Sequence, residues 1–184
     1  MPVAFDAAAT ASSSASPFSW THTPVGTPTT VVVGVAIREA LTTVSGITYG
    51  GVAMVFVRAD VVATLVANEV WILNNPPAAA QTVTVTLVAA QATASISVTV
   101  TGSATAGQPA NHAGATGAST APTVTVTSAA GRLVIGYVHS RRNNTDAQIA
   151  VGAGQTQRAS VSGPTADRPR HEATDEAGAA SVVT

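Results

Sequence analysis

The fold is decided by Thr82-Val83-Thr84-Val85-Thr86, a stretch in which threonine and valine alternate strictly. Two further stretches repeat the pattern: Ser95-Ile96-Ser97-Val98-Thr99-Val100-Thr101 and Thr123-Val124-Thr125-Val126-Thr127. Successive side chains of a β-strand point to opposite faces, so the apolar residues share one face and the hydroxylated residues the other. A helix would scatter the same residues around its circumference. The pattern therefore predicts half-buried antiparallel strands.

Apolar runs outside these stretches predict further strands. They are expected at Val3–Asp6, Pro17–His22, Thr29–Ile37, Val44–Tyr49, Glu69–Leu73, Leu133–His139, Ala147–Val151 and Gln155–Val161, with a last strand beginning at Ala179. Thr29–Ile37 is apolar on both faces, which is typical of a central strand. Gly50-Gly51 indicates a hairpin, because both central residues of a type I′ turn need a positive φ.

The connecting segments are less regular. Ala7–Ser16 and Ser162–Arg170 are interpreted as loops, and Arg58–Ala67 is compatible with either a short helix or a strand. Thr123–Thr127 is expected to pair with Leu133–His139 across a tight turn. Residues 102–122 contain almost only small and polar residues and predict a loop well beyond the usual length in a compact domain.

The expected fold is all-β: an antiparallel sandwich or jelly roll of roughly ten to twelve short strands without a long helix. With 184 residues the chain fits a single domain, residues 1–184. Aromatic residues make up only 4% of it, so the core rests on Val, Ile and Leu with a few large anchors.

Charged residues are scarce in this chain, and their scarcity indicates which kinds of partner to expect. Charged residues make up 9% of the chain, the net charge is −1, and all eight basic residues are arginine. They form no basic stripe that would neutralise phosphates, so no nucleic-acid partner is expected. A surface this low in charge lacks one usual defence against association, which suits assembly into something larger.

The chain contains no cysteine, which excludes disulfides and cysteine-rich metal sites. Met1–Asp6 lacks the basic region and apolar run of a signal peptide, so we expect synthesis without a secretion signal. No apolar segment approaches the roughly 20 residues that cross a bilayer, so no membrane partner is expected.

Titratable residues give no convincing site. His22, His112, His139 and His171 stand at no metal-ligand spacing from one another, so no metal is expected. His22 and His139 are interpreted as strand residues with one polar neighbour. The only acidic cluster, 171–176, lacks the ligand spacing of a calcium loop and is interpreted as a solvated surface turn.

Catalytic motifs are absent from the sequence. There is no Gly-x-Ser-x-Gly elbow, and carboxylates could be paired only from distant positions such as Glu39, Asp60 and Glu69. Gly152-Ala153-Gly154 is a turn, since no Lys-Ser/Thr follows it. Asn143-Asn144-Thr145 is interpreted as a polar loop rather than a glycosylation site. We therefore expect a protein that is not an enzyme, with no catalytic, cofactor-binding or metal-binding residues and no cofactor.

The order of several motifs resembles a β-sandwich module of phage virion proteins and large bacterial surface proteins. The sharpest is Ile47-Thr48-Tyr49-Gly50-Gly51-Val52. The others are Phe5-Asp6-Ala7-Ala8, Phe18-Ser19-Trp20-Thr21-His22, Val31-Val32-Val33-Gly34-Val35, Val70-Trp71-Ile72-Leu73 with Asn75-Pro76-Pro77, 82–87, 152–158 and 176–182. This resemblance covers most of the chain and transfers no catalytic residue.

The resemblance implies a non-enzymatic virion structural protein, made in the host cytoplasm and displayed on the virion surface. Its favoured role is capsid decoration, in which the subunit binds the major capsid protein or other virion proteins, with a homotrimer as the favoured oligomer. The N-terminal segment and the 102–122 loop are the expected contact arms. The chain departs from the module in two ways. Its final strand is short, which leaves an edge that a neighbouring subunit would cover. The segment Val57–Asn68 is unusually apolar and is interpreted as an interface element.

The alternative is a carbohydrate-binding or adhesive module of a phage tail or bacterial surface protein. It requires at least two exposed aromatic side chains, and Trp20 and Trp71 are the candidates. In a chain this poor in aromatics, Trp20, Tyr49 and Trp71 are more easily explained as core anchors.

Overall fold

The computed structural model describes residues 2–39, 42–102, 111–117, 122–141, 149–165, 169–179 and, for the backbone, 181–183. These residues form fourteen β-strands and no helix, which confirms the predicted all-β class. The strand number exceeds the predicted ten to twelve because several pieces are only two or three residues long. Among the described residues there is no helix long and apolar enough to cross a membrane.

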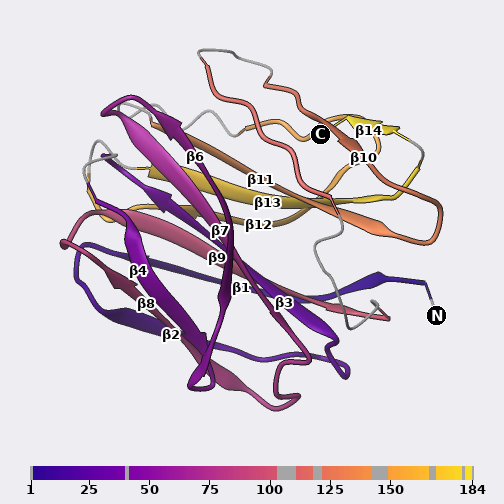
Figure 1. Cartoon of the computed structure of the whole chain (residues 1–184), viewed down its shortest axis with the longest axis horizontal. Helices are drawn as coiled ribbons and strands as arrows, with labels where there is room; N and C mark the ends of the chain where they lie inside the picture. Colours follow the sequence, from indigo (N-terminus) through magenta and orange to yellow (C-terminus); the bar gives the residue numbers. More distant parts are fainter. Residues whose placement is uncertain are drawn as a thin grey trace.

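Three antiparallel sheets are stacked in layers, with the largest in the middle (Figure 1). The central sheet contains, in spatial order, β1 (Ala4–Ser13), β9 (Thr93–Thr101), β3 (Thr30–Ile37), β7 (Val66–Asn74) and β6 (Val55–Val62). The lower sheet contains β2 (Phe18–His22), β8 (Gln81–Leu87), β4 (Val44–Tyr49) and β5 (Val52–Ala53). The upper sheet contains β11 (Leu133–Arg141), β13 (Pro169–Ala177) and β12 (Thr156–Ser162), and β10 (Thr125–Thr127) pairs separately with β14 (Ser181–Val183).

The interface between the central and lower sheets is an apolar core. β3 has a neighbour on each side, as predicted for a central strand, and its odd-numbered side chains from Val31 to Ile37 are completely buried against the lower sheet. The lower sheet contributes Ile47, Tyr49, Val83, Val85 and Leu87. Alternation on β8 is as predicted, because its valines face this core while Thr82 and Thr86 are exposed.

A second core lies between the central and upper sheets. It contains Ile96, Val98 and Val100 of β9 together with Ala173, and Phe5, Ile135 and Tyr137 pack against it. The hydroxylated face of β9 is buried as well, since Ser95, Ser97 and Thr99 have no exposed surface. The prediction that β9 is half-buried is therefore wrong, because the lower sheet covers the face that its sequence suggested would meet solvent.

Two local predictions concern the chain around Gly50. Gly50 and Gly51 have φ values of 57° and 81°, which confirms the positive-φ hairpin turn between β4 and β5. The returning strand pairs with β4 only as far as Ala53, and the chain then crosses to the edge of the central sheet as β6. The ambiguous segment 58–67 is thus strand on either side of a short turn, not helix.

Several sequence predictions are corrected by the pairing. Ala7–Ser16 is largely strand, because β1 runs to Ser13 alongside β9, so it is not a free N-terminal arm. β10 pairs with β14 instead of forming a hairpin with β11. β11 pairs with β13, a strand that sequence analysis interpreted as a loop followed by a surface turn. These partners are distant in sequence, and alternation alone does not specify them.

Other predictions fall partly on residues outside the described ranges. Of the long 102–122 loop, the described residues 111–117 and 122 form no strand, and residues 103–110 and 118–121 lie outside the described part. Of the strand expected at 147–151, residues 149–151 are not strand, and residues 147 and 148 are outside the described part.

Candidate functional site

The outer edge of the central sheet exposes an unusual number of apolar side chains. β6 is the last strand of this sheet, and within the described residues no other strand pairs with its outer edge. Val55 is 64% exposed, and Phe56 and Val61 are each 48% exposed. Val52 and Leu65, next to the two ends of β6, are about as exposed. We call these five residues the β6 surface.

Two opposite charges lie in the middle of β6. Arg58 and Asp60 form an ion pair, with Nε of Arg58 donating to Oδ2 of Asp60 at 2.8 Å. They lie on the upper side of the sheet, where their partners on β7 are Val70 and Asn68. Phe56 lies on the lower side, where its ring meets the Trp71 ring edge-on at a centroid distance of 5.4 Å.

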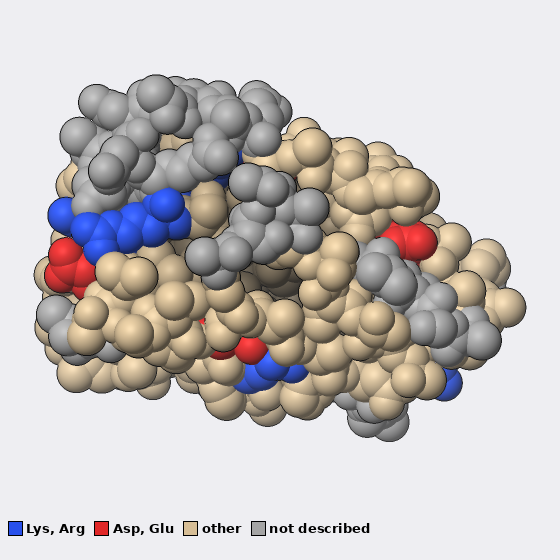
Figure 2. Space-filling model, turned by 90° about the horizontal axis from the view of Figure 1, so that it is seen from above, with Lys and Arg blue, Asp and Glu red and all other residues tan. Residues whose placement is uncertain are grey.

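A cavity of about 1640 Å³ lies above β6 and β7, between them and β11. Its walls include Val62, Val66, Val70 and Ile72 from the central sheet, Tyr137 and His139 from β11, and residues 111–117. Figure 2 shows the molecule from above, hollowed near its centre and with charged residues at only a few places among the described residues on this face. Small-molecule pockets usually measure about 300–1,000 Å³, so this volume exceeds what a small ligand fills.

The cavity wall contains polar atoms without hydrogen-bond partners. They are Oδ1 of Asn68, Nε2 of His139 and Oγ of Ser140, all buried. Burial lowers the pKa of His139 to about 4, and the nearby Asp60 carboxylate only partly opposes this. His139 is therefore neutral at pH 7, and the Asp60 carboxylate is already paired with Arg58. The cavity shows no nucleophile paired with a base among the described residues, so it gives no support to catalysis.

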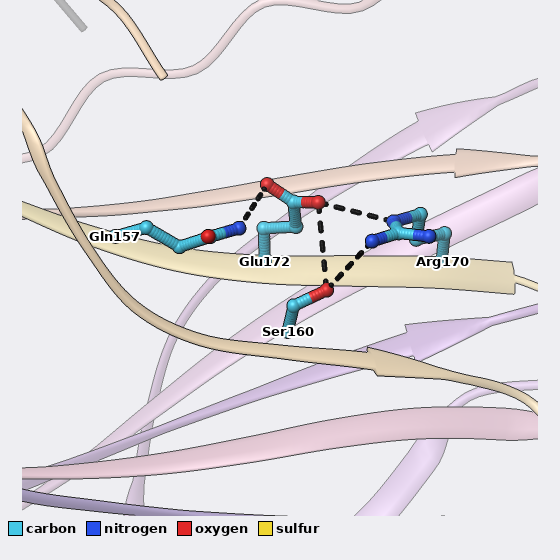
Figure 3. A network of polar contacts seen from close by, with 4 residues as sticks. All are labelled: Gln157, Ser160, Arg170 and Glu172. Carbon is cyan, nitrogen blue, oxygen red and sulfur yellow. Dashed lines mark hydrogen bonds and ion pairs between the residues drawn. The ribbon is translucent and has the colours of Figure 1, made fainter. Parts of the chain in front are cut away.

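The predicted acidic surface turn is instead a buried strand with a polar network (Figure 3). Glu172, only 1% exposed, accepts hydrogen bonds from Arg170 Nε at 3.0 Å and Gln157 Nε2 at 2.8 Å. Ser160 Oγ lies 3.0 Å from Arg170 Nη2, which donates to it. The network joins β12 to β13, and its contacts satisfy the charge that burial would otherwise penalise.

A second ion pair closes the other end of the same two strands. Arg158 donates to both carboxylate oxygens of Asp175, at 2.8 and 2.9 Å. Its guanidinium also lies 4.2 Å from the centre of the Phe5 ring, which adds a cation–π contact with β1. The acidic residues are therefore structural, and the prediction of a solvated turn is wrong.

His22 has two polar neighbours rather than the one predicted. Its Nδ1 lies 2.7 Å from Ser97 Oγ, and its Nε2 lies 3.0 Å from Thr99 Oγ1. Trp20 Nε1 donates to Ser97, and Thr99 donates to Asp6. A neutral His22 with its proton on Nε2 satisfies this whole chain of hydrogen bonds. Burial lowers the pKa of His22 to about 4, in agreement with a neutral ring.

A serine bonded to a histidine resembles a nucleophile with its base. Here His22, Ser97 and Thr99 have no exposed surface and lie between two sheets, so no substrate reaches them. The arrangement is therefore a buried polar layer that fixes β2 on the central sheet.

The remaining histidines lie on β11, on β13 and in the segment 111–117. His139 and His171 are register partners on β11 and β13, and His171 Nδ1 donates to the Ala94 carbonyl at 3.1 Å. Burial lowers the pKa of His171 to about 3. His112 lies 3.3 Å from Arg58. Within the described ranges no three metal-ligating side chains come together.

The distant carboxylates are not brought together as a catalytic pair. Glu69 Oε1 accepts the Val44 N–H of the lower sheet at 3.0 Å, whereas Asp60 lies on the opposite side of the central sheet. Burial raises the pKa of Glu69. Glu39 lies near Arg38, with 3.8 Å between the charged atoms. Each carboxylate thus has its own partner.

The tryptophans are half-buried core residues. Trp20 and Trp71 pack against the lower core, and Tyr49 is completely buried. Both indole N–H groups are occupied, by Ser97 and by Glu69 respectively. This agrees with the interpretation of these residues as core anchors.

Residues 152–155 form a turn in which the Gln155 N–H donates to the Gly152 carbonyl and Gly154 has a φ of 85°. The sequon at 143–145 lies outside the described residues. Val61 and Leu65 of the β6 surface fall within Val57–Asn68, the segment whose apolar sequence predicted an interface element, whereas its other three residues precede that segment.

The fold and its surfaces define a layered all-β protein without a recognisable active site among the described residues. No family model, curated protein or solved structure matches the chain.

Proposed function

We propose that this chain is a non-enzymatic structural protein of a phage virion, and that it decorates the capsid by binding the major capsid protein. The observation that carries the proposal is the β6 surface. Several exposed large apolar side chains along a sheet edge are typical of a site of protein association.

The scarcity of charge supports the same role. With charged residues at 9% of the chain, much of the surface is neutral, and neutral polar and apolar surface is buried at low desolvation cost. Several of the acidic side chains are engaged in internal ion pairs, as Asp175 and Glu172 illustrate. The protein therefore has little charge with which to keep copies or partners apart.

The copy number of the chain in purified virions tests this role. Quantitative mass spectrometry of particles from the phage that encodes it should find hundreds of copies for a capsid decoration protein. A handful of copies would place it in the tail. Its absence from purified particles would overturn the virion role.

The second candidate, a carbohydrate-binding or adhesive module, receives less support. It needs exposed aromatic side chains, and the two tryptophans are packed against the core with their N–H groups occupied. The test is a glycan array probed with the purified chain. Specific binding that is lost in Trp71→Ala but kept in Phe56→Ala would favour this candidate over capsid decoration.

A further inference from the structure

We propose that the occupant of the β6 edge is a second copy of this chain, whose own β6 pairs with it antiparallel about a two-fold axis at Ala59. The pairing would join two five-stranded central sheets into one continuous sheet. It uses the surface that carries the proposed function, but it concerns the purified chain alone and does not require a capsid.

The edge of β6 is available for such pairing. β6 is eight residues long, and beyond its register shift it is regular from Arg58 to Val62. Along the described chain, the backbone of β6 makes strand hydrogen bonds only with β7. An unpaired strand edge presents a row of free N–H and C=O groups, which a second strand satisfies.

The faces of the sheet restrict the possible registers. In an antiparallel two-fold pair the upper face of one copy continues into the upper face of the other, so directly opposite residues must share a face. The axis must therefore pass through a residue rather than between two residues. Arg58 and Asp60 are on the upper face, and Ala59 lies between them on the lower face.

Charge then distinguishes among the central registers. An axis at Arg58 would set two arginines opposite each other, and an axis at Asp60 would set two aspartates opposite each other. Like charges directly opposite destabilise a strand pair, and opposite charges stabilise it by roughly 0.2–1 kcal/mol. Only an axis at Ala59 sets Arg58 of each copy opposite Asp60 of the other. The sequence of the edge is therefore complementary to itself.

Charges and bulges on an edge strand usually oppose pairing. β6 has both, since a register shift occurs between Phe56 and Arg58. Against an unrelated strand, Arg58 and Asp60 would oppose pairing because they would lose water without gaining an oppositely charged partner. Against a second copy of β6, Arg58 of each copy lies opposite Asp60 of the other, and the opposite charges attract.

The test uses charge reversal and mixing in the full chain. Analytical ultracentrifugation should give a wild-type species of twice the 18.2 kDa chain mass across a dilution series. Arg58→Glu alone and Asp60→Lys alone should each weaken the dimer at least about tenfold, equivalent to about 1.4 kcal/mol. An equimolar mixture of the two variants should restore it. In the mixed dimer the introduced glutamate faces the introduced lysine, and the native Asp60 of one copy faces the native Arg58 of the other.

Two controls keep the result interpretable. The double variant Arg58→Asp with Asp60→Arg retains both the internal and the intermolecular pairing, so it should dimerise like wild type. Glu39→Lys makes the same charge reversal at the surface pair with Arg38 and should leave the dimer unchanged. Thermal unfolding of each variant verifies that it is folded.

Several results would overturn the inference: a monomeric wild-type chain, a three-chain mass as in the predicted homotrimer, single variants that dimerise normally, or a mixture that stays monomeric. A monomeric chain that is nevertheless abundant on virions would remove the self-pairing and leave the proposed capsid role intact.

Discussion

Gly34 and Tyr137 lie so close that no side chain fits between them. A Cβ at Gly34 would be 2.6 Å from Cδ1 of Tyr137 and 2.7 Å from Cε1 of His171. Because Gly34 has no side chain, the upper sheet packs directly against β3. The Tyr137 hydroxyl donates to the Val32 carbonyl of β3 at 3.1 Å. A single glycine thus sets how closely the central and upper sheets pack.

We expect Gly34→Ala to destabilise the protein by about 2–4 kcal/mol, because the His171 ring is completely buried and the Tyr137 ring is held by its hydroxyl hydrogen bond. Urea unfolding measures this change. Gly46→Ala is the matched control, since a Cβ there meets nothing within 4 Å, and it should shift stability by no more than about 0.5 kcal/mol. Equal effects at the two positions would contradict the close-packing explanation.

Three buried histidines make stability depend on pH. The pKa values of His22 and His139 are lowered to about 4, and that of His171 to about 3, all by burial. Between pH 6.5 and about 4 the unfolded chain therefore binds more protons than the folded one. Stability is fully present above pH 6.5 and falls as the pH drops through this window. The raised pKa of Glu69 makes the stability increase as the pH falls, but Glu69 is a single group and the three histidines act in the other direction.

Replacing one histidine should remove its share of this dependence. His22→Asn should lower the slope of unfolding free energy against pH by up to about 1.4 kcal/mol per pH unit between about pH 4 and 6.5. His112→Asn, at an exposed position, is the control for the substitution itself. Urea titrations at several pH values measure both. An unchanged slope in His22→Asn would show that His22 is not buried as a neutral ring.

Much of the layered fold follows from the period-two pattern. Val83 and Val85 alternate with threonines and point into the lower core as the pattern predicts, and the doubly apolar β3 occupies the middle of the central sheet. These elements were predictable because apolar side chains mark a buried face locally, in each strand's own residues.

The partners of a strand are not encoded in this way. Ser97 sits on a face that alternation assigns to solvent, yet the lower sheet covers it, and small hydroxylated residues tolerate this burial through hydrogen bonds. The sequence did not predict β13, because it contains the charged residues Glu172 and Asp175, which suggested an exposed turn. In the folded protein Arg170 on β13 neutralises Glu172, and Arg158 on β12 neutralises Asp175. Only Val61 and Leu65 of the β6 surface lie in the apolar segment 57–68 that the sequence indicated, and the position of the surface at a sheet edge follows only from the pairing order.

The buried hydroxyl of Ser97 should contribute measurably to stability. Ser97→Ala leaves Trp20 Nε1 and His22 Nδ1 without a partner, which we expect to cost about 1–3 kcal/mol. Ser45→Ala is the control, because Ser45 is exposed and bonds only the Thr86 carbonyl. Chemical denaturation of both variants tests the difference, and a Ser97→Ala protein as stable as Ser45→Ala would argue against a structural polar layer.

Glu172 provides the sharpest test of the buried network in the upper sheet. Glu172→Gln removes the charge that pairs with Arg170, which is itself only 11% exposed, and a buried guanidinium without its counter-ion is costly. We expect a loss of about 3–5 kcal/mol, as for other broken buried pairs. Glu39→Gln breaks the half-exposed pair with Arg38 and should cost about 0–1 kcal/mol. A double-mutant cycle with Arg170→Gln isolates the coupling: if the two single losses simply add, Glu172 and Arg170 do not stabilise each other and the network is only incidental.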